Sequence, residues 1–413
     1  MRSLALPNLP AFLKPTEGSP VADLFESLSL GKTVSLKNRI VMAPMTRTRT
    51  SPGDVPNDLM ARYYGQRAGA GLIITEAIDV APSSKGYAWT PGIYTDAQRK
   101  GWRLVTDEIH RKGGTVFAQL WHVGRMAHPS ILPNGQAPWG VTEQRAENSD
   151  VFAHDGNGVL GYIRAGAPRR LATQEVSDLV GTFARAFADL QGAGFDGVEL
   201  HAANGYLFEQ FMNPVLNTRT DRYGGRSLED RTRFLTEVVD AGVRQFGPGR
   251  IGVRLSPFGL FNSMPADPDV EGTLLYLAEE LGRRGVGYLH LIYELMPTGN
   301  METAEFKARC IDHALLAKVR AAFPGAIIWC GGFKSREGAQ AALATGLVDL
   351  IAFGRPFVGN PDLPDRLRHG WPLAEADRST YYTRRGEIGF TDFPVYPAPS
   401  PIAVRAGSST ASR

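Results

Sequence analysis

The chain passes from a strand to a helix within residues 194–212, which read Gly194-Phe-Asp-Gly-Val-Glu-Leu-His-Ala-Ala-Asn-Gly-Tyr-Leu-Phe-Glu-Gln-Phe-Met212. Residues 197–201 form a short apolar run that suits a buried strand, and from Leu207 onward apolar residues recur at helical spacing. A polar corner lies between the two. This stretch is one strand-to-helix unit of the kind from which parallel sheets are built.

The same alternation of a short apolar run and a longer helical segment recurs along the chain. It predicts eight strands, at residues 39–43, 72–76, 115–120, 197–201, 251–255, 288–292, 326–329 and 350–353. Ser227-Leu-Glu-Asp230 predicts a capping box at the start of one intervening helix. Eight such units favour an α/β fold, a closed (β/α)8 TIM barrel, although an open doubly wound sheet has the same order of elements.

One segment interrupts this rhythm. Residues 122–170, after the third strand, are rich in Pro, Gly and Asn and too long for a simple connection, so we expect them to form a flap over one end of the barrel. We expect three parts in the chain: an N-terminal extension at 1–23, one barrel domain at 24–396, and a disordered tail at 397–413, whose Pro, Ala, Ser and Arg residues cannot form a core.

Composition narrows the class of protein. The 413 residues are 43% hydrophobic and 21% charged with a net charge of +3, and no run of five or six like charges suits a nucleic-acid backbone. Prolines break the first nineteen residues and no stretch of eighteen apolar residues occurs, so we expect a cytoplasmic protein without a membrane span. Cys310 and Cys330 form no CxxC motif, and His122 and His128 lack helical i, i+4 spacing, so no disulfide or metal site is expected.

In a barrel of this kind the catalytic groups follow the carboxyl ends of the strands. The residues found there are polar or small where a core would be apolar: Pro44, Met45, Thr46, Ala77, Gln119, Trp121, His201, Asn204, Tyr206, Arg254, Gly331, Gly332, Gly354 and Arg355.

Two features of this set indicate a phosphorylated cofactor. Gly331 and Gly332 allow backbone N–H groups to approach a phosphate, and Arg355 can bind it with two N–H groups. The alternative is that the glycines only end strands and Arg355 forms a surface ion pair. Arg254 is a cation within an apolar strand and needs an anion or an electron-rich ring nearby. Its alternative partner is Glu199 in a buried ion pair.

The polar corner after the fourth strand predicts acid–base chemistry. His201 and Asn204 can donate hydrogen bonds to a carbonyl oxygen as negative charge develops on it. Tyr206, with an ordinary pKa of about 10, stays protonated at neutral pH and can deliver a proton. A histidine that merely packs at the corner is the alternative.

Taken together, these residues resemble the old yellow enzyme family of FMN-dependent ene-reductases. The matching stretches run in family order and comprise residues 37–47, 74–77, 119–125, 194–206, 217–225 and 353–362. Thr46, where another branch has cysteine, and the His201/Asn204 pair, where some members have two histidines, both resemble the classical branch of the family.

The resemblance implies a role for each position. The FMN ring would contact Pro44, Met45, Thr46, Ala77, Gln119 and Arg254. The FMN phosphate would contact Gly331, Gly332, Gly354 and Arg355. His201 and Asn204 would polarise the substrate carbonyl, Tyr206 would donate the proton, and Trp121 and Tyr382 would shape the substrate pocket.

The resemblance also implies the reaction. NADPH, or NADH, would reduce non-covalently bound FMN, and hydride would then pass from flavin N5 to the β-carbon of an α,β-unsaturated carbonyl or similar activated alkene, while Tyr206 protonates the α-carbon. A reductase of nitro or nitrate-ester groups, a redox-neutral isomerase and a flavin-binding protein without turnover are the alternatives. Small molecules are the expected partners of a monomer or homodimer, and we expect the loop at 293–303 and the flap to select the substrate.

Overall fold

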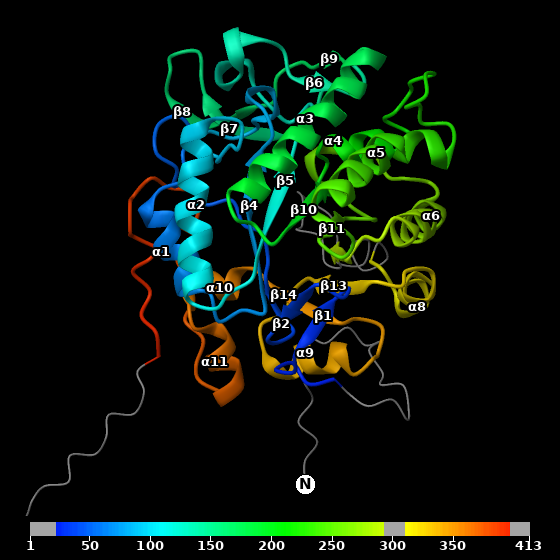
Figure 1. Cartoon of the computed structure of the whole chain (residues 1–413). Helices are drawn as coiled ribbons and strands as arrows, with labels where there is room; N and C mark the ends of the chain where they lie inside the picture. Colours follow the sequence, from blue (N-terminus) through cyan, green and yellow to red (C-terminus); the bar gives the residue numbers. More distant parts are fainter. Residues whose placement is uncertain (1–21, 293–309, 397–413) are drawn as a thin grey trace, which may run out of the picture.

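Eight parallel strands close into a barrel surrounded by helices (Figure 1). The computed structural model describes residues 22–292 and 310–396. In spatial order the strands are β3 (Ile40–Met42), β4 (Leu72–Asp79), β5 (Val116–Trp121), β10 (Gly197–Ala202), β11 (Ile251–Leu255), β12 (Tyr288–Ile292), β13 (Ala326–Cys330) and β14 (Leu350–Phe353), with β14 pairing back onto β3. The (β/α)8 prediction is confirmed, and the open sheet is excluded. The predicted loop at 293–303 and tail at 397–413 lie outside the described residues, as does nearly all of the predicted N-terminal extension.

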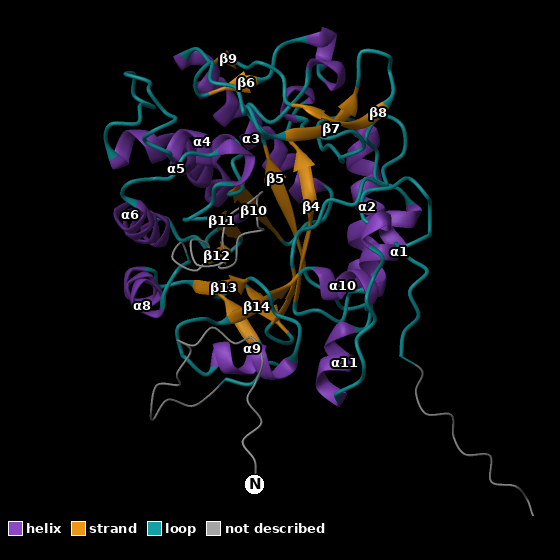
Figure 2. Ribbon diagram, turned by 180° about the vertical axis from the view of Figure 1, so that it is seen from behind, coloured by secondary structure: helices purple, strands orange, loops and turns teal. Residues whose placement is uncertain are grey.

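Helices follow the strands in the expected alternation (Figure 2). They are α1 (Asp58–Gln66), α2 (Asp96–Arg111), α3 (Thr173–Gly192), α4 (Leu207–Met212), α5 (Leu228–Phe246), α6 (Val270–Arg283), α8 (His313–Ala322), α9 (Arg336–Leu343), α10 (Arg355–Gly359) and α11 (Leu363–His369). The side chain of Ser227 accepts a hydrogen bond from the backbone N–H of Asp230 at 3.0 Å, so α5 begins at the predicted N-cap. The reciprocal bond from Ser227 N–H to Asp230, which would complete the predicted capping box, does not occur among the described residues.

The amino-terminal end of the barrel is closed by apolar side chains. A hairpin of β1 (Leu28–Leu30) and β2 (Val34–Leu36) packs against inward-facing residues such as Phe117, Tyr288 and Ile328. A Cβ atom on Gly252 would lie 2.0 Å from the ring of Tyr288, so only glycine leaves room for this aromatic ring inside the barrel. The polar inward-facing side chains therefore lie at the carboxyl end of the barrel.

The insertion after β5 covers that carboxyl end. It contains β6 (Trp139–Gly140), β7 (Asp150–His154), β8 (Leu160–Arg164) and β9 (Arg169–Arg170), with β7 and β8 forming an antiparallel hairpin. Figure 2 shows this hairpin beyond the arrowhead of β4. Val151 and Ala153 of β7 share an apolar cluster with Ala77, Trp121 and Tyr206. The predicted flap therefore packs directly on predicted site residues. None of the described helices is both long and apolar enough to cross a bilayer.

Candidate active site

The barrel gathers the predicted site residues around one opening. They follow or end β3, β4, β5, β10, β11, β13 and β14, and the carboxyl ends of parallel strands all meet at the same end of a barrel. Tyr382 comes from the segment after α11 and still reaches this end, because its phenol is among the groups that raise the pKa of Tyr206. Tyr382 is 46% exposed, which places this residue at the rim.

His201 lies between two aromatic rings at the end of β10. It stacks on Trp121, with centroids 6.1 Å apart, and meets the edge of Tyr206 at 4.9 Å. Burial, followed by the charges of Arg254 and His290, lowers the pKa of His201 well below its ordinary value, so the imidazole is neutral at pH 7. Its Nδ1 is buried and has no hydrogen-bond partner among the described residues. A ligand at the barrel mouth can supply that partner.

Tyr206 is held as a protonated phenol. Its OH donates to the OH of Tyr87 at 3.3 Å. Burial raises the pKa of Tyr206 well above its ordinary value, and the neighbouring phenols of Tyr87 and Tyr382 raise it further. The sequence did not single out Tyr87, because it lies in a loop after β4 where no periodic pattern marks it.

Trp121 is fixed by a carboxylate that the sequence also left unmarked. Its Nε1 donates to Asp79 Oδ1 at 2.7 Å, and Thr90 Oγ1 donates to the other oxygen of the same carboxylate at 2.7 Å. The second predicted strand, 72–76, was too short, because β4 continues past the register shift between Ile74 and Ala77 to Asp79. The indole plane that supports His201 is therefore anchored at its far edge.

Below the mouth, the buried carboxylate of Glu199 pairs with a histidine. Glu199 Oε2 lies 2.8 Å from His290 Nδ1, and Glu199 Oε1 accepts from Gln119 Nε2 at 2.8 Å. The alternative ion pair between Glu199 and Arg254 is absent from the contacts of the described residues. Arg254 is 8% exposed, and its Nε has no hydrogen-bond partner among residues 22–292 and 310–396. Its Nη2 donates to Cys330 Sγ at 3.7 Å.

The glycines after β13 and β14 occupy backbone positions that suit them. Gly331 has φ 151° and Gly332 has φ 68°, both in the region that other residues rarely adopt. A Cβ on Gly354 would lie 3.8 Å from Met45 Sδ, so the turn after β14 borders the segment after β3. Arg355 is exposed at the start of α10. These neighbouring strand ends form an open, glycine-lined edge of the barrel mouth.

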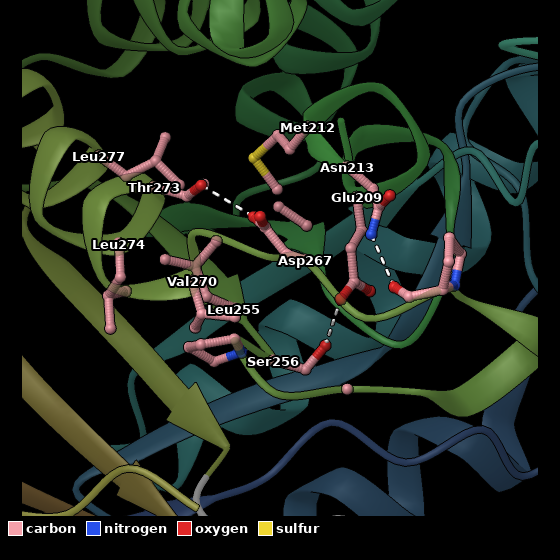
Figure 3. Close-up of a pocket in the computed structure, with 14 residues that line it drawn as sticks. Glu209, Met212, Asn213, Leu255, Ser256, Asp267, Val270, Thr273, Leu274 and Leu277 are labelled. Carbon is pink, nitrogen blue, oxygen red and sulfur yellow. Dashed lines mark hydrogen bonds between the residues drawn. The ribbon is translucent and has the colours of Figure 1, made fainter. Parts of the chain in front are cut away.

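A cavity of about 50 Å³ lies behind the polar corner that follows β10, on the outer side of β10 and β11 (Figure 3). None of the predicted site residues lines it, and it is too small for a flavin ring. Figure 3 shows Glu209 of α4 beside it, bonded to Ser256. The carboxyl group of Glu209 accepts from Ser256 Oγ at 3.0 Å and from the N–H of Gly205, and Ser256 Oγ accepts from the N–H of Asn204 at 2.8 Å. Because Asn204 has φ 59°, this network holds a strained corner in place.

Replacing Glu209 by glutamine is expected to change the pH dependence of stability. Burial raises the pKa of Glu209 to about 8 from the ordinary 4.5, so the folded chain keeps a proton that the unfolded chain releases. The stability of the native protein should therefore fall as pH rises from about 4.5 to about 8. Glu209→Gln should not show this decrease, because glutamine does not titrate.

Melting temperatures measured from pH 5 to 9 test this, with Glu209→Ala as the matched variant. The melting temperature of Glu209→Gln minus that of the native protein should increase as pH rises to about 8 and should stay constant above that pH. Glu209→Ala should be less stable than Glu209→Gln throughout, by about 1–3 kcal/mol, because the N–H of Gly205 loses its partner. A difference between Glu209→Gln and the native protein that does not change with pH would contradict a raised pKa.

Known proteins match almost all of the described chain. Residues 23–374 match the NADH:flavin oxidoreductase / NADH oxidase family. The protein 12-oxophytodienoate reductase 1 of Oryza sativa subsp. japonica is 43% identical over 364 residues, which cover 87% of this chain and 90% of the rice protein.

Solved structures agree with the sequence match. Morphinone reductase in complex with tetrahydroNAD superposes with a TM-score of 0.84 at 44% identity, covering 91% of this chain and 98% of that protein. The old yellow enzyme homologue from Zymomonas mobilis gives a TM-score of 0.81 at 35% identity, covering 91% of this chain and 100% of that protein. The similarity thus spans the barrel together with the residues around its mouth.

Proposed function

The chain belongs to the NADH:flavin oxidoreductase / NADH oxidase family, and from that premise we propose that it reduces the carbon–carbon double bond of an α,β-unsaturated carbonyl compound or similar activated alkene. The resemblance to the old yellow enzymes is thereby confirmed, and the protein is an FMN-dependent oxidoreductase. One observation carries the finer proposal: a neutral histidine and a protonated phenol, His201 and Tyr206, meet at 4.9 Å at the barrel mouth.

The residues at the mouth fit FMN. We assign the ring to Pro44, Met45, Thr46, Ala77, Gln119 and Arg254, and the phosphate to Gly331, Gly332, Gly354 and Arg355. Support comes from Arg254, a nearly buried cation whose Nε lacks a partner among the described residues, and from the two glycines with positive φ. When bound, FMN supplies the hydride transfer that no side chain can perform.

The chain's own groups bind and protonate the alkene. Asn204 and the neutral imidazole of His201 donate hydrogen bonds to the substrate carbonyl, and these bonds strengthen as negative charge builds on its oxygen. Tyr206 gives its phenolic proton to the α-carbon. Trp121 and Tyr382 line the slot for the substrate, and the flap residues packed on Tyr206 exclude water from it.

We propose a reduced nicotinamide, NADPH or NADH, as the source of electrons. Morphinone reductase, a structural neighbour, has been solved with tetrahydroNAD, which supports a nicotinamide site in this architecture. We further propose that the enzyme acts on small molecules in the cytoplasm as a monomer or homodimer.

Product analysis tests the proposed reaction. FMN-loaded protein given NADPH or NADH and 2-cyclohexenone should form cyclohexanone, with one nicotinamide oxidised per alkene reduced. Nicotinamide oxidation that depends on a nitro compound and not on the enone would instead favour the nitroreductase alternative, and no oxidation with either would favour a flavin-binding protein.

Replacing Arg254 by methionine is expected to weaken FMN binding and to lower the flavin midpoint potential. The guanidinium is proposed to lie beside the edge of the ring that becomes negative on reduction, so its loss should destabilise the reduced form more than the oxidised form. The dissociation constant of oxidised FMN should rise by about 10- to 100-fold, as for loss of a charged hydrogen bond.

Arg355→Met is the matched control for Arg254→Met. The proposed contact of Arg355 is the phosphate, whose charge does not change on reduction, so this variant should weaken FMN binding and leave the midpoint potential unchanged. Fluorescence titration and spectroelectrochemistry measure the two quantities. If Arg254→Met and the native protein have the same flavin midpoint potential, the proposed contact between Arg254 and the flavin ring is wrong.

A further inference from the structure

A second chemical group lies at the barrel mouth, the thiol of Cys330. Cys330 ends β13, packs with the inward-facing cluster, and is only partly buried. Its Sγ lies 3.7 Å from Nη2 of Arg254, and Gly331 follows it in the chain. It therefore stands between the proposed ring contact and the first proposed phosphate contact. A ligand that contacts both Arg254 and Gly331 therefore lies close to this thiol.

The groups beneath Cys330 are those that activate a cysteine. His290 is fully buried, its Nδ1 lies 2.8 Å from Glu199, and its Nε2 has no hydrogen-bond partner among the described residues. Burial raises the pKa of the Cys330 thiol, but the hydrogen bond to His290 and the charge of Arg254 outweigh it, so the net pKa is lowered. A guanidinium 3.7 Å from the sulfur and an imidazole that lowers the pKa of the thiol are the surroundings of an activated cysteine nucleophile.

We propose that Cys330 is an alkylation site that captures electrophilic alkenes when the flavin seat is empty and that bound FMN shields it. The inference rests on the proposed function in placing FMN over the thiol. In the reaction, the sulfur forms a bond to the β-carbon, the π bond of the alkene breaks, and the α-carbon takes up the proton that the thiol releases. Atoms and electrons balance, so no oxidant or reductant is required.

A consequence follows for the enzyme's own substrate class. Activated alkenes are Michael acceptors, so the compounds that the FMN-loaded enzyme reduces also inactivate the flavin-free chain. The alkyl group attached to Cys330 would fill the space between Arg254 and Gly331 and prevent FMN from entering. Loading with FMN thus protects the protein from its substrates.

N-ethylmaleimide, itself an activated alkene, is the probe for this site. The full-length chain, freed of FMN and checked for its fold by circular dichroism, is labelled with and without added FMN, and the rate at each cysteine is followed by peptide mass spectrometry. Cys330 should react faster than Cys310 in the flavin-free chain. At an FMN concentration about 100 times its dissociation constant, labelling of Cys330 should slow by about 100-fold while Cys310 is unaffected.

Two variants sharpen the test. In Cys330→Ser, the maleimide labelling that FMN suppresses should be absent, and the variant should still bind FMN after maleimide treatment. In His290→Gln, half-maximal labelling of Cys330 should move to higher pH, whereas the pH profile of Cys310 stays the same. A purely structural role for His290 would not move that profile.

Two results would overturn the proposal: a Cys330 rate that bound FMN does not change, or a flavin-free Cys330 that reacts no faster than Cys310. Failure of the proposed function remains distinguishable. If fluorescence titration shows that FMN does not bind, the flavin assignment fails, and the comparison of the two cysteines in the flavin-free chain still decides whether Cys330 is activated.

Discussion

Replacing Tyr206 by phenylalanine is expected to slow alkene reduction by about 10²- to 10⁴-fold and to leave reduction of the flavin by the nicotinamide nearly intact. The phenol is the proposed proton donor to the α-carbon, and its pKa, raised above the ordinary value first by burial, keeps it protonated across the working pH range. The phenylalanine ring retains the contact with His201 and Trp121, so the substitution should remove only the proton donor.

Stopped-flow measurement of the two half-reactions checks this division. Tyr87→Phe is the matched control, because it removes the partner of the Tyr206 hydroxyl at 3.3 Å and leaves the proposed donor in place. Its effect on alkene reduction should be far smaller. Equal slowing of both half-reactions in Tyr206→Phe would show that the hydroxyl shapes the site rather than protonates the substrate.

His201→Ala should weaken carbonyl binding and slow the oxidative half-reaction by about 10²- to 10³-fold, the range for loss of one donor to a developing oxyanion. Asn204→Ala should act in the same direction, because both side chains are proposed to meet the same oxygen. The pKa of His201 is held well below its ordinary value, chiefly by burial, so His201 should add no inflection to the rate between about pH 6 and pH 9.

His201→Asn tests whether the donor itself matters. Asparagine restores an N–H in a similar direction and should recover part of the rate that alanine loses, whereas a purely packing role for the ring would leave His201→Asn as slow as His201→Ala. Substrate dissociation constants that are the same in the native protein and His201→Ala would contradict the proposed contact with the carbonyl.

The strands and the positions after them were predictable because each depends on neighbouring residues. A run such as 251–255 is apolar apart from Arg254 over the length of one strand, and the structure begins and ends β11 at the predicted residues. Closure was not predictable from periodicity, since an open sheet has the same element order; it was implied by the family resemblance. The end of β4 was missed because a register shift, which apolar patterning does not reveal, extends the strand to Asp79.

The supporting residues of the site could not be read from the sequence because their partners are far along the chain. Asp79 and Trp121 are 42 positions apart, and Glu199 and His290 are 91 apart. Each is an ordinary polar residue until the barrel closes. Glu209 lies nearer to its corner but reads as one acidic residue in a helix. Residues at strand ends can be predicted from their position in the sequence, whereas the groups that orient them are identified only from contacts in the structure.

The central claim is that FMN at the barrel mouth passes electrons from a nicotinamide to an activated alkene. The most direct test is an anaerobic spectrum of the purified protein loaded with FMN. The account predicts that NADPH or NADH bleaches the flavin absorbance and that one equivalent of 2-cyclohexenone restores it. A protein that takes up no FMN, or whose reduced flavin stays bleached when the enone is added, would contradict the account.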